Sequence, residues 1–230
     1  MEQIEEHPVV QSIKLNYIFY ITIIVCVCAI AYCNETSYFW AIITMVFISV
    51  AGYCSHYISH RINATELFKQ FNDKYSMVEN EHVKTGIEMF CKLTDFHDIT
   101  HHNTDINKQW GNLAMEFALN FYVQAGAFIL LFYVIRQMNL YVITLWGLMY
   151  ATIHNINYVL YPSNTHILHH VDKKTNYGID IWDILFHTKY DGDSSTSQLE
   201  NINHYAINTA LITLLIIVII HLKVSIKIGF

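Results

Sequence analysis

Nine of the fourteen histidines gather at or just beyond the ends of long apolar segments. These histidines are His56 and His60; His97, His101 and His102; His154; and His166, His169 and His170. Neutral imidazole is the commonest protein ligand of redox-active iron, so clusters of this kind predict a metal site. One ion accepts only about four to six ligands, so nine candidates predict two ions in one site.

The spacing within the first two clusters is helical. His56 and His60 are separated by three residues at the end of an apolar segment, which places both rings on one face of a continuing helix. His97 and His101 repeat this spacing, and His102 adds a neighbour. Each cluster is therefore expected to share a metal ion or to bracket two.

The third cluster has the same character. His166, His169 and His170 occupy positions i, i+3 and i+4, so we expect them on one helical face. His154 lies near the end of an apolar segment, where either a buried metal ligand or a polar partner explains it. Isolated histidines elsewhere are more often solvated than ligating, and this applies to His7, His82, His204 and His221.

Carboxylates beside the clusters are expected to orient imidazole N–H groups rather than to bind metal directly. They are Asp95, Asp98, Asp172, Asp180 and Asp183. Soluble di-iron bundles instead use glutamates with Glu-x-x-His pairs, a motif that this chain lacks. No nucleophile elbow, phosphate loop or dinucleotide fingerprint occurs either.

The composition indicates a membrane protein. Hydrophobic residues make up 53% of the 230 and charged residues only 14%, whereas about a quarter of residues are charged in soluble domains. The net charge of -6 is spread out without a basic stripe, which argues against nucleic acid as a partner. The five cysteines form no Cys-x-x-Cys pair and are expected to be reduced packing residues.

Five apolar segments are candidates to position the histidines, and each is close to the ~20 residues that cross a bilayer. They are about 15–33, 38–54, 113–135, 140–160 and 205–222. We therefore expect an all-α, polytopic membrane protein with four to five transmembrane helices. Residues 1–230 form a single domain, with a histidine-rich core at about 50–190 and an extra C-terminal transmembrane helix at about 205–222.

The polar stretches at 61–113 and 161–204 are expected to form a cytosolic helical cap that holds the di-metal site. With a cytosolic N-terminus, ten of the thirteen lysines and arginines lie on the cytosolic side, as the positive-inside rule requires. The short apolar stretch at 179–186 cannot span and is expected along the membrane interface. Residues 191–198 are expected to form a flexible loop.

The later motifs resemble those of the membrane fatty acid hydroxylase and sterol desaturase superfamily. Its C-terminal signature is a His-x-Asn step, then His-x-x-His-His, Asn-Tyr-Gly and Trp-Asp-x-Leu-Phe. The matching residues here are 154–157, 166–170, 176–178 and 182–186. The histidines at 56–60 and 97–102 are similar to the first two boxes of that family, so the resemblance covers roughly residues 50 to 190.

The chain departs from the family pattern in three places. The second box has three residues between its first histidines, His97 and His101, where the family usually has two. Tyr158 stands where some members carry a further histidine, and His187 replaces the glycine of the usual closing motif. His187 is therefore a candidate extra ligand in place of the missing one, with a solvated loop histidine as the alternative.

The resemblance implies a membrane enzyme of an internal membrane such as the endoplasmic reticulum, with the metal site facing the cytosol. Two iron ions would use O2 to hydroxylate or desaturate a lipid C–H bond, in a fatty acyl chain, a sphingolipid or a sterol; zinc could replace iron after heterologous expression. Electrons would come from an external donor such as cytochrome b5 or a ferredoxin. The residues expected to support the ligands are Asp98, Asn157, Asn176 and Asp183.

Three alternatives stay open at the level of sequence. Within the enzyme class, the chain could be an ether-lipid or sterol desaturase. A membrane haem protein that carries electrons would use facing histidine pairs deep in a helical bundle. A divalent-metal transporter would need ionisable ligands near the bilayer midplane, where Glu116 is the only acidic candidate well inside a span.

Overall fold

The computed structural model describes residues 7–103, 105–126, 128–129, 136–190 and 202–228. Every regular element within these ranges is a helix, which confirms the expected all-α class for this part of the chain. The elements are α1 (Pro8–Leu15), α2 (Tyr17–Cys33), α3 (Tyr38–Ser59), α4 (Ala64–Tyr75), α5 (Glu81–Thr94), η1 (His97–His101), α6 (Trp110–Phe121), η2 (Tyr122–Gly126), α8 (Leu140–Ala151), η3 (Thr152–Asn157), α9 (Tyr158–Leu160), α10 (Asn164–Val171), α11 (Asp180–Leu185) and α12 (Ile202–Ile228).

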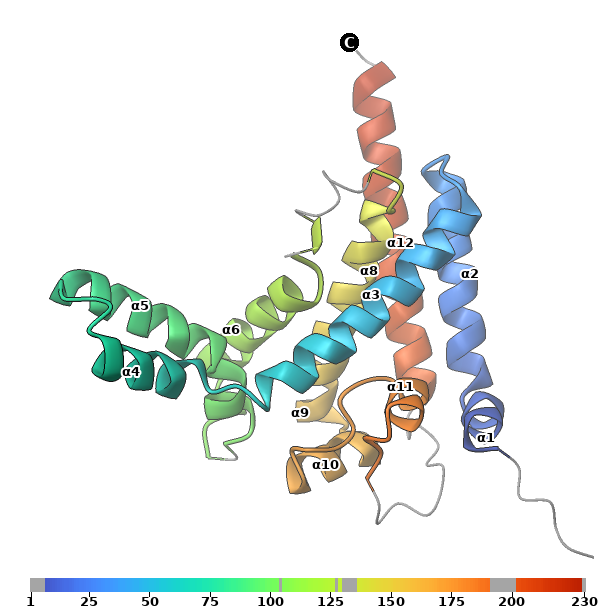
Figure 1. Ribbon diagram of the computed structural model, residues 1–230. Helices are drawn as coiled ribbons and strands as arrows, with labels where there is room; N and C mark the ends of the chain where they lie inside the picture. The colour runs from blue at the N-terminus through green and yellow to red at the C-terminus, as the bar shows by residue number, and fades with distance from the viewer. Residues whose placement is uncertain (1–6, 104, 127, 130–135, 191–201, 229–230) are drawn as a thin grey trace, which may run out of the picture.

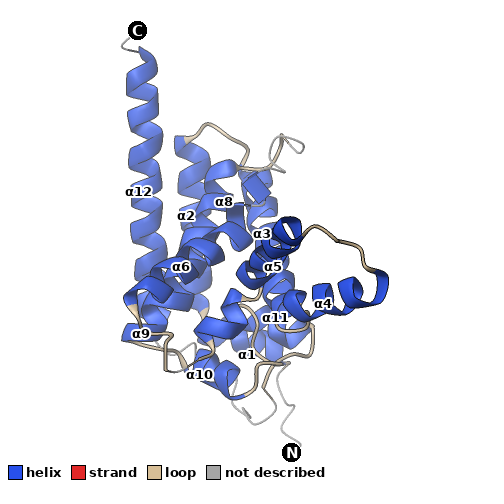
Figure 2. Cartoon of the chain, turned by 90° about the vertical axis from the view of Figure 1, so that its left-hand side faces the viewer, coloured by secondary structure: helices blue, strands red, loops and turns tan. Residues whose placement is uncertain are grey.

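Helices α2, α3, α8 and α12 form an apolar bundle, with α12 lying along α2 and α8 (Figure 1 and Figure 2). Its core consists of fully buried aliphatic and aromatic side chains, among them Phe19, Ile30, Ile48, Leu145 and Ile216. The outward faces of α2 and of the middle of α12 are also apolar, with exposed side chains such as Ile21, Val25, Leu211 and Val218. Helices that are hydrophobic on every side are typical of a lipid environment.

Among the described residues, two helices are long and apolar enough to cross a membrane, Tyr38–Ser59 and His204–Lys223. The number of candidate spans rises to three if α1 and α2 are counted as one span, although the chain bends by 73° between them. The expectation of four to five transmembrane helices is therefore wrong, because the structure supports two or three.

The expected third and fourth spans are interrupted by π-helical turns. Helix α6 ends at Phe121 and continues as η2, while α8 ends at Ala151 and continues as η3. A π-turn takes an extra residue and often marks a functional position. The hydrophobicity of a segment does not depend on the width of its helical turns. The sequence therefore predicted both segments as uninterrupted spans. Residues 130–135, at the end of the expected third span, and the expected loop at 191–198 lie outside the described residues.

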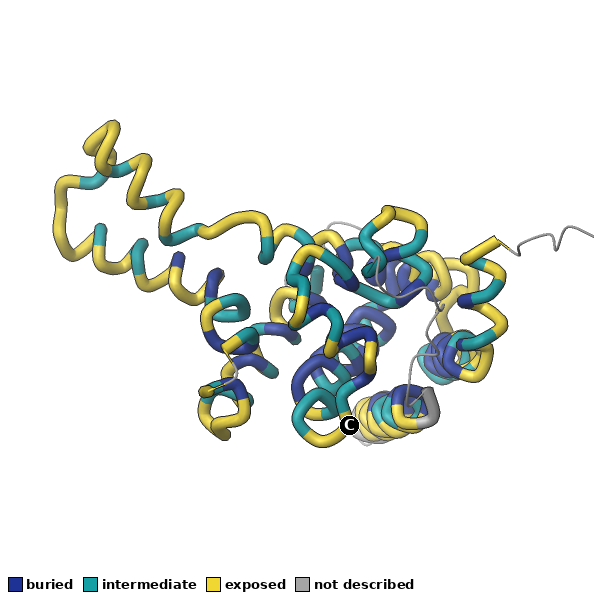
Figure 3. The backbone as a smooth tube through the Cα atoms, turned by 90° about the horizontal axis from the view of Figure 1, so that it is seen from below, coloured by how far each residue is buried: buried dark blue, intermediate teal, exposed yellow. Residues whose placement is uncertain are grey.

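Helices α4 and α5 form an arm that projects sideways from the bundle (Figure 1), and most of its surface is exposed (Figure 3). The Asp95 carboxylate, at the end of α5, accepts hydrogen bonds from the backbone N–H groups of Ala64 and Thr65 at 2.7 and 2.8 Å. These bonds join the end of the arm to its beginning, because they satisfy free N–H groups in the first turn of α4. The surface helices expected in this region are present.

The stretch expected along the membrane interface forms the short helix α11. Its two carboxylates, Asp180 and Asp183, are both buried, and Asp180 pairs with Lys189 at 3.0 Å. The apolar side chains of Leu185 and Phe186 at the end of this segment are exposed, so its expected position along the membrane interface stays a prediction. Helix α11 packs against α1 at the same end of the bundle as α10.

Candidate metal centre

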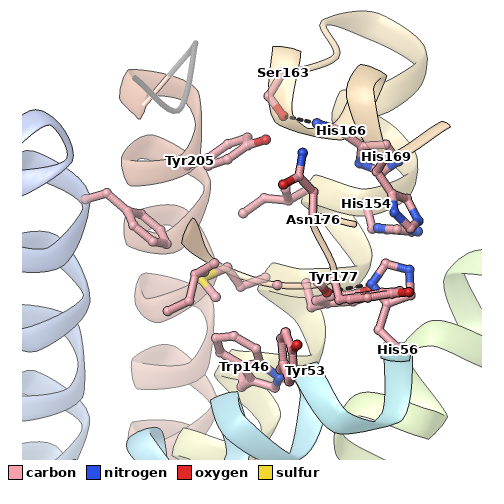
Figure 4. Close-up of a pocket in the computed structure, with 16 residues that line it drawn as sticks. Tyr53, His56, Trp146, His154, Ser163, His166, His169, Asn176, Tyr177 and Tyr205 are labelled. Atoms are coloured by element: carbon pink, nitrogen blue, oxygen red, sulfur yellow. Dashed lines mark hydrogen bonds between the residues drawn. The ribbon is translucent and has the colours of Figure 1, made fainter. Parts of the chain in front are cut away.

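All nine clustered histidines meet at one end of the bundle. They come from the last turn of α3, from η1 and the residue after it, from η3 and from α10. Figure 4 shows part of this convergence, with His56 on α3 near His154, His166 and His169. Residues more than one hundred positions apart in the chain thus share one site.

The first group of ligands is His56, His60, His97 and His169, which we call cluster A. One ring nitrogen from each of these four lies within 4.8 Å of the others. The Nε2 atoms of His56 and His60 are 3.1 Å apart. Cluster A therefore joins three separate elements, α3, η1 and α10.

The second group, cluster B, is a nearly equilateral triangle of imidazole nitrogens. The Nε2 atoms of His101, His166 and His170 are separated by 3.0, 3.1 and 3.0 Å. Ligands about 2.1 Å from one ion would lie about 3.0 Å apart at right angles and about 3.4 Å apart in a tetrahedron. The three nitrogens are therefore close enough together to share one ion.

His154 and His102 lie between the two clusters. The His154 ring is centred 5.1 Å from His56 of cluster A and 4.4 Å from both His101 and His166 of cluster B. His102 places its Nε2 3.3 Å from that of His60, and its ring is 4.4 Å from that of His170. Both side chains are therefore within reach of either cluster.

Backbone carbonyls determine which nitrogen is available in two of these rings. His56 Nδ1 lies 2.6 Å from the carbonyl oxygen of Tyr177, and His169 Nδ1 lies 2.6 Å from that of Thr175. A carbonyl can only accept, so each Nδ1 must donate its proton. The Nε2 of each neutral ring is then a bare lone pair that faces the cluster. This orientation is typical of metal-binding histidines.

Other Nδ1 atoms face polar side chains. His97 Nδ1 is 3.3 Å from Glu116 Oε2, and His60 Nδ1 is 3.5 Å from Asp98 Oδ1. His170 Nδ1 is 3.4 Å from the Tyr158 hydroxyl. The distance between His60 and Asp98 is at the edge of hydrogen-bond distance. All three contacts leave the Nε2 atom of the histidine directed inwards.

Burial keeps the rings outside the membrane spans neutral. It lowers the pKa of His101, His166 and His169 well below its usual value, and neighbouring imidazoles lower it further. The pKa of His170 is lowered to about 4, again chiefly by burial. Neutral rings with inward lone pairs repel one another unless a cation lies between them. The buried cluster could therefore hold a metal ion, and imidazole ligands suit iron, zinc, copper or nickel.

The third histidine cluster divides between the two groups of ligands. His166 and His170, four residues apart, join cluster B, whereas His169 turns to cluster A. The rings of His169 and His170 are nearly perpendicular, at 86°. The prediction that the triplet shares one helical face is therefore too coarse, because a 3-residue step rotates the side chain to the other side of that face. His97 and His101 also belong to different clusters, although they are four residues apart, and both lie in the π-turn η1.

The four residues expected to support the ligands take different positions. Asp98 lies beside His60 and is paired with Lys173 at 2.8 Å. Asp183 accepts from the backbone N–H groups of Tyr177 and Gly178, so it acts on His56 only through the Tyr177 carbonyl. Burial raises the pKa of Asp183 to about 7, although these hydrogen bonds favour its carboxylate form.

The two asparagines among these four residues contact other polar groups instead of the ligand rings. Asn157 Oδ1 accepts from Asn208 at 3.0 Å, and Asn176 Nδ2 donates to the Thr165 carbonyl at 3.1 Å. Asn176 thus joins the segment after α10 to α10 itself. His187 is exposed with a left-handed backbone (φ 55°) and belongs to neither cluster.

Glu116 supports a candidate ligand, although the sequence suggests it only as the acidic group of a transporter. It is buried, and its Oε2 lies 3.3 Å from His97 Nδ1. Its position four residues before Asn120 was the available signal, since Asn120 Nδ2 donates to Glu116 Oε2 at 3.2 Å. The carbonyl acceptors of Tyr177 and Thr175 carry no side-chain signal and could not be found from composition.

Two cavities adjoin the histidines. The larger, of about 600 Å³, lies between α3, α5, α6 and η2 and reaches His56, His97 and Glu116. The smaller, of about 80 Å³, is shown in Figure 4 and reaches His154, His166 and His169 from the side of the apolar bundle. The cluster is thus accessible to a small molecule on one side and to a much larger one on the other.

Comparisons with protein-family models, curated proteins and solved structures found no match to this chain. The likeness to the hydroxylase and desaturase superfamily therefore stays a prediction from the motifs. The histidine geometry stands independently of it.

Proposed function

We propose that this chain is a membrane di-iron oxidoreductase that uses O2 and an external electron donor to hydroxylate or desaturate a lipid C–H bond. The observation that carries the proposal is the convergence of imidazole Nε2 atoms in two adjacent clusters at the end of an apolar bundle. In this proposal cluster A and cluster B each hold one ion, with His154 and His102 available to either.

Bound iron would supply the means to reduce O2 and to attack an unactivated C–H bond. The protein's part is to hold and orient the ligands and to exclude water. The carbonyls of Tyr177 and Thr175 hold two rings, and Glu116 holds a third through His97. Burial of the cluster keeps bulk water away, which protects a reactive oxidant from side reactions.

The reaction balances with two electrons from a donor outside this chain. Hydroxylation puts one oxygen atom of O2 into the C–H bond and reduces the other to water, consuming two electrons and two protons. Desaturation removes two hydrogens from the lipid with the same two electrons and two protons and yields two water molecules. The resemblance suggests cytochrome b5 or a ferredoxin as the donor, and it covers acyl chains, sphingolipids, ether lipids and sterols as substrates.

The geometry favours metal ions bound directly by the histidines over a haem group. Two axial imidazoles on opposite sides of a haem iron would place their Nε2 atoms about 4 Å apart, with the porphyrin ring between them. The clustered Nε2 atoms lie only 3.0–3.3 Å apart in several pairs. A transporter is also less well supported, because the histidines gather at one end of the bundle rather than at its middle.

Lipid profiling tests the proposal. Cells that express the chain under O2 should accumulate a hydroxylated or desaturated lipid, and cells that express a His169→Ala/His170→Ala variant should not. The variant removes one ligand from each cluster, while water can fill the freed positions and the apolar bundle need not collapse. His82→Ala, at an exposed histidine of the arm, is the matched control and should behave as wild type. Wild-type product from the double variant would contradict the proposal.

A further inference from the structure

The larger cavity opens onto an apolar surface. Six hydrophobic side chains that line it are also exposed, by 38 to 66%. They are Ile58, Ile62, Phe90, Leu93, Tyr122 and Val123. Ile58 belongs to the candidate span Tyr38–Ser59, and Phe90 and Leu93 belong to the projecting arm. An exposed apolar rim of this kind is typical of a membrane contact or a ligand groove, and Ile58 lies at the end of a candidate span.

The inner end of the cavity is polar. It is formed by His56 and His97 of cluster A, together with Glu116 and Tyr150. Glu116 is only 2% exposed. The cavity therefore changes character along its length, from an apolar mouth to a polar floor at the metal ligands.

Glu116 has an oxygen that the described residues leave unsatisfied. Its Oε2 faces His97 and Asn120, whereas its Oε1 is buried without a hydrogen-bond partner among them. Gln124, further along the same wall, is satisfied at both ends by the Gly52 carbonyl and the Trp146 indole. A buried acceptor without a partner is unfavourable, so a donor on a bound molecule would be favourable at this position.

The wall between floor and mouth is one stripe of helix α6 and its continuation. Glu116, Leu119 and Val123 are spaced as i, i+3 and i+7, and all three line the cavity. Seven residues of helix rise about 10 Å. The hydrocarbon chain of a ligand whose polar end lies at Glu116 can therefore extend past Leu119 and Val123 to the apolar mouth.

We propose that this cavity binds an amphiphile with one hydrocarbon chain in the cavity and a hydroxyl or amide N–H next to the carbon that is oxidised. The donor hydrogen-bonds to Glu116 Oε1, and the chain runs along α6 and leaves between α3 and α5 into the bilayer. The nature of the reaction rests on the proposed function, whereas binding does not require it. Oxidation would then fall near the polar end of the lipid rather than at its far methyl end.

Photolabelling of zinc-loaded protein tests the binding directly. The probe is a long-chain primary alcohol with a diazirine about 10 Å along the chain from its hydroxyl, at the depth of the mouth, and it is added to the full-length protein in detergent. Labels should appear on residues of the mouth, such as Val123, Phe90 or Leu93. Leu119→Trp, which fills the cavity, should abolish the labelling, while Met115→Trp should not, because Met115 is exposed on the same helix and does not line the cavity.

Competition identifies the polar contact. Unlabelled alcohol should displace the probe at concentrations about 10-fold or more below those needed by the hydrocarbon of equal length, since hydrogen bonds to charged groups contribute about 1.5–3 kcal/mol. Glu116→Gln should narrow this difference. Equal competition by alcohol and hydrocarbon in the wild type, or unchanged labelling of Leu119→Trp, would overturn the inference. Correct binding without lipid oxidation by the iron-loaded protein would instead overturn the proposed function alone.

Discussion

Two histidines of cluster A use their two ring nitrogens for different purposes. Nδ1 of His56 is held by the Tyr177 carbonyl and Nδ1 of His169 by the Thr175 carbonyl, and Nε2 of each ring faces the cluster. Because a neutral ring has one donor and one acceptor, a fixed donor determines the direction of the lone pair. The orientation of the ligands is thus built into the segment that follows α10.

Asp183 should contribute to metal binding from a distance. It accepts from the backbone of Tyr177 and Gly178, so Asp183→Asn disturbs the carbonyl that orients His56. We expect metal affinity to fall by about 10- to 100-fold, which is milder than the loss of a ligand. Competition with a chelator measures this affinity. Asp73→Asn, at an exposed carboxylate of α4, should be unchanged, and wild-type affinity in Asp183→Asn would contradict the assigned role.

The metal-free protein should lose stability on mild acidification. The folded-state pKa of His170 is about 4, below the value of about 6.5 expected in the unfolded chain. Between these two pKa values the unfolded state binds more protons than the folded state. The free energy of unfolding is therefore highest above pH 6.5 and decreases as the pH falls towards 4. His101, His166 and His169 act in the same direction. Thermal unfolding after chelation checks this, and a midpoint that rises on acidification would contradict it.

At the level of the helices, the i, i+4 spacing was informative where a pair shares one cluster. His56 with His60, and His166 with His170, are brought together as that spacing predicts. The assignment of His169 to cluster A could not be predicted, because it depends on long-range packing of α10 against α3. The π-turns η1, η2 and η3 were equally hidden, since no residue type specifies the extra residue in a turn.

Close helix packing depends on small residues beside the site. A methyl group at Gly52 of α3 would collide with the Gln124 amide and lie 2.7 Å from the Trp146 indole nitrogen. We expect Gly52→Ala to destabilise the bundle by about 1–3 kcal/mol, because the core cannot accommodate the added volume.

Gly86→Ala is the matched control for this substitution. Gly86 lies within α5, and an added methyl would meet no atom within 4 Å. Alanine at an open helical position should stabilise the protein by about 0.5–1 kcal/mol. Thermal unfolding midpoints in detergent compare the two variants. A stabilising Gly52→Ala would contradict the packing described for α3 and α8.

The molecule as a whole separates an apolar bundle from a histidine-rich end. The composition was sufficient to predict a helical membrane protein, but the number of spans was overestimated because broken helices were counted as whole ones. The arm of α4 and α5 and the segments around α10 were both expected on the cytosolic side. For one site to form from them, they must lie on the same side of the membrane.

Topology can be tested with inserted tags. Tags after Lys84, in the arm, and after Lys174, beyond α10, should be digested by protease from the same side of sealed vesicles. A tag at the C-terminus should be accessible from the other side, because α12 leads away from the histidines as a candidate span (Figure 1). Access to Lys84 and Lys174 from opposite sides would exclude a single shared site.

Anomalous X-ray scattering at the iron edge tests the two-ion centre most directly. Crystals of the iron-loaded protein should show two anomalous peaks, one within cluster A (His56, His60, His97 and His169) and one within cluster B (His101, His166 and His170). The close approach of imidazole nitrogens within each cluster is the reason to expect both to be filled. A single peak, or peaks that lie outside these seven imidazoles, would contradict the proposed di-iron centre.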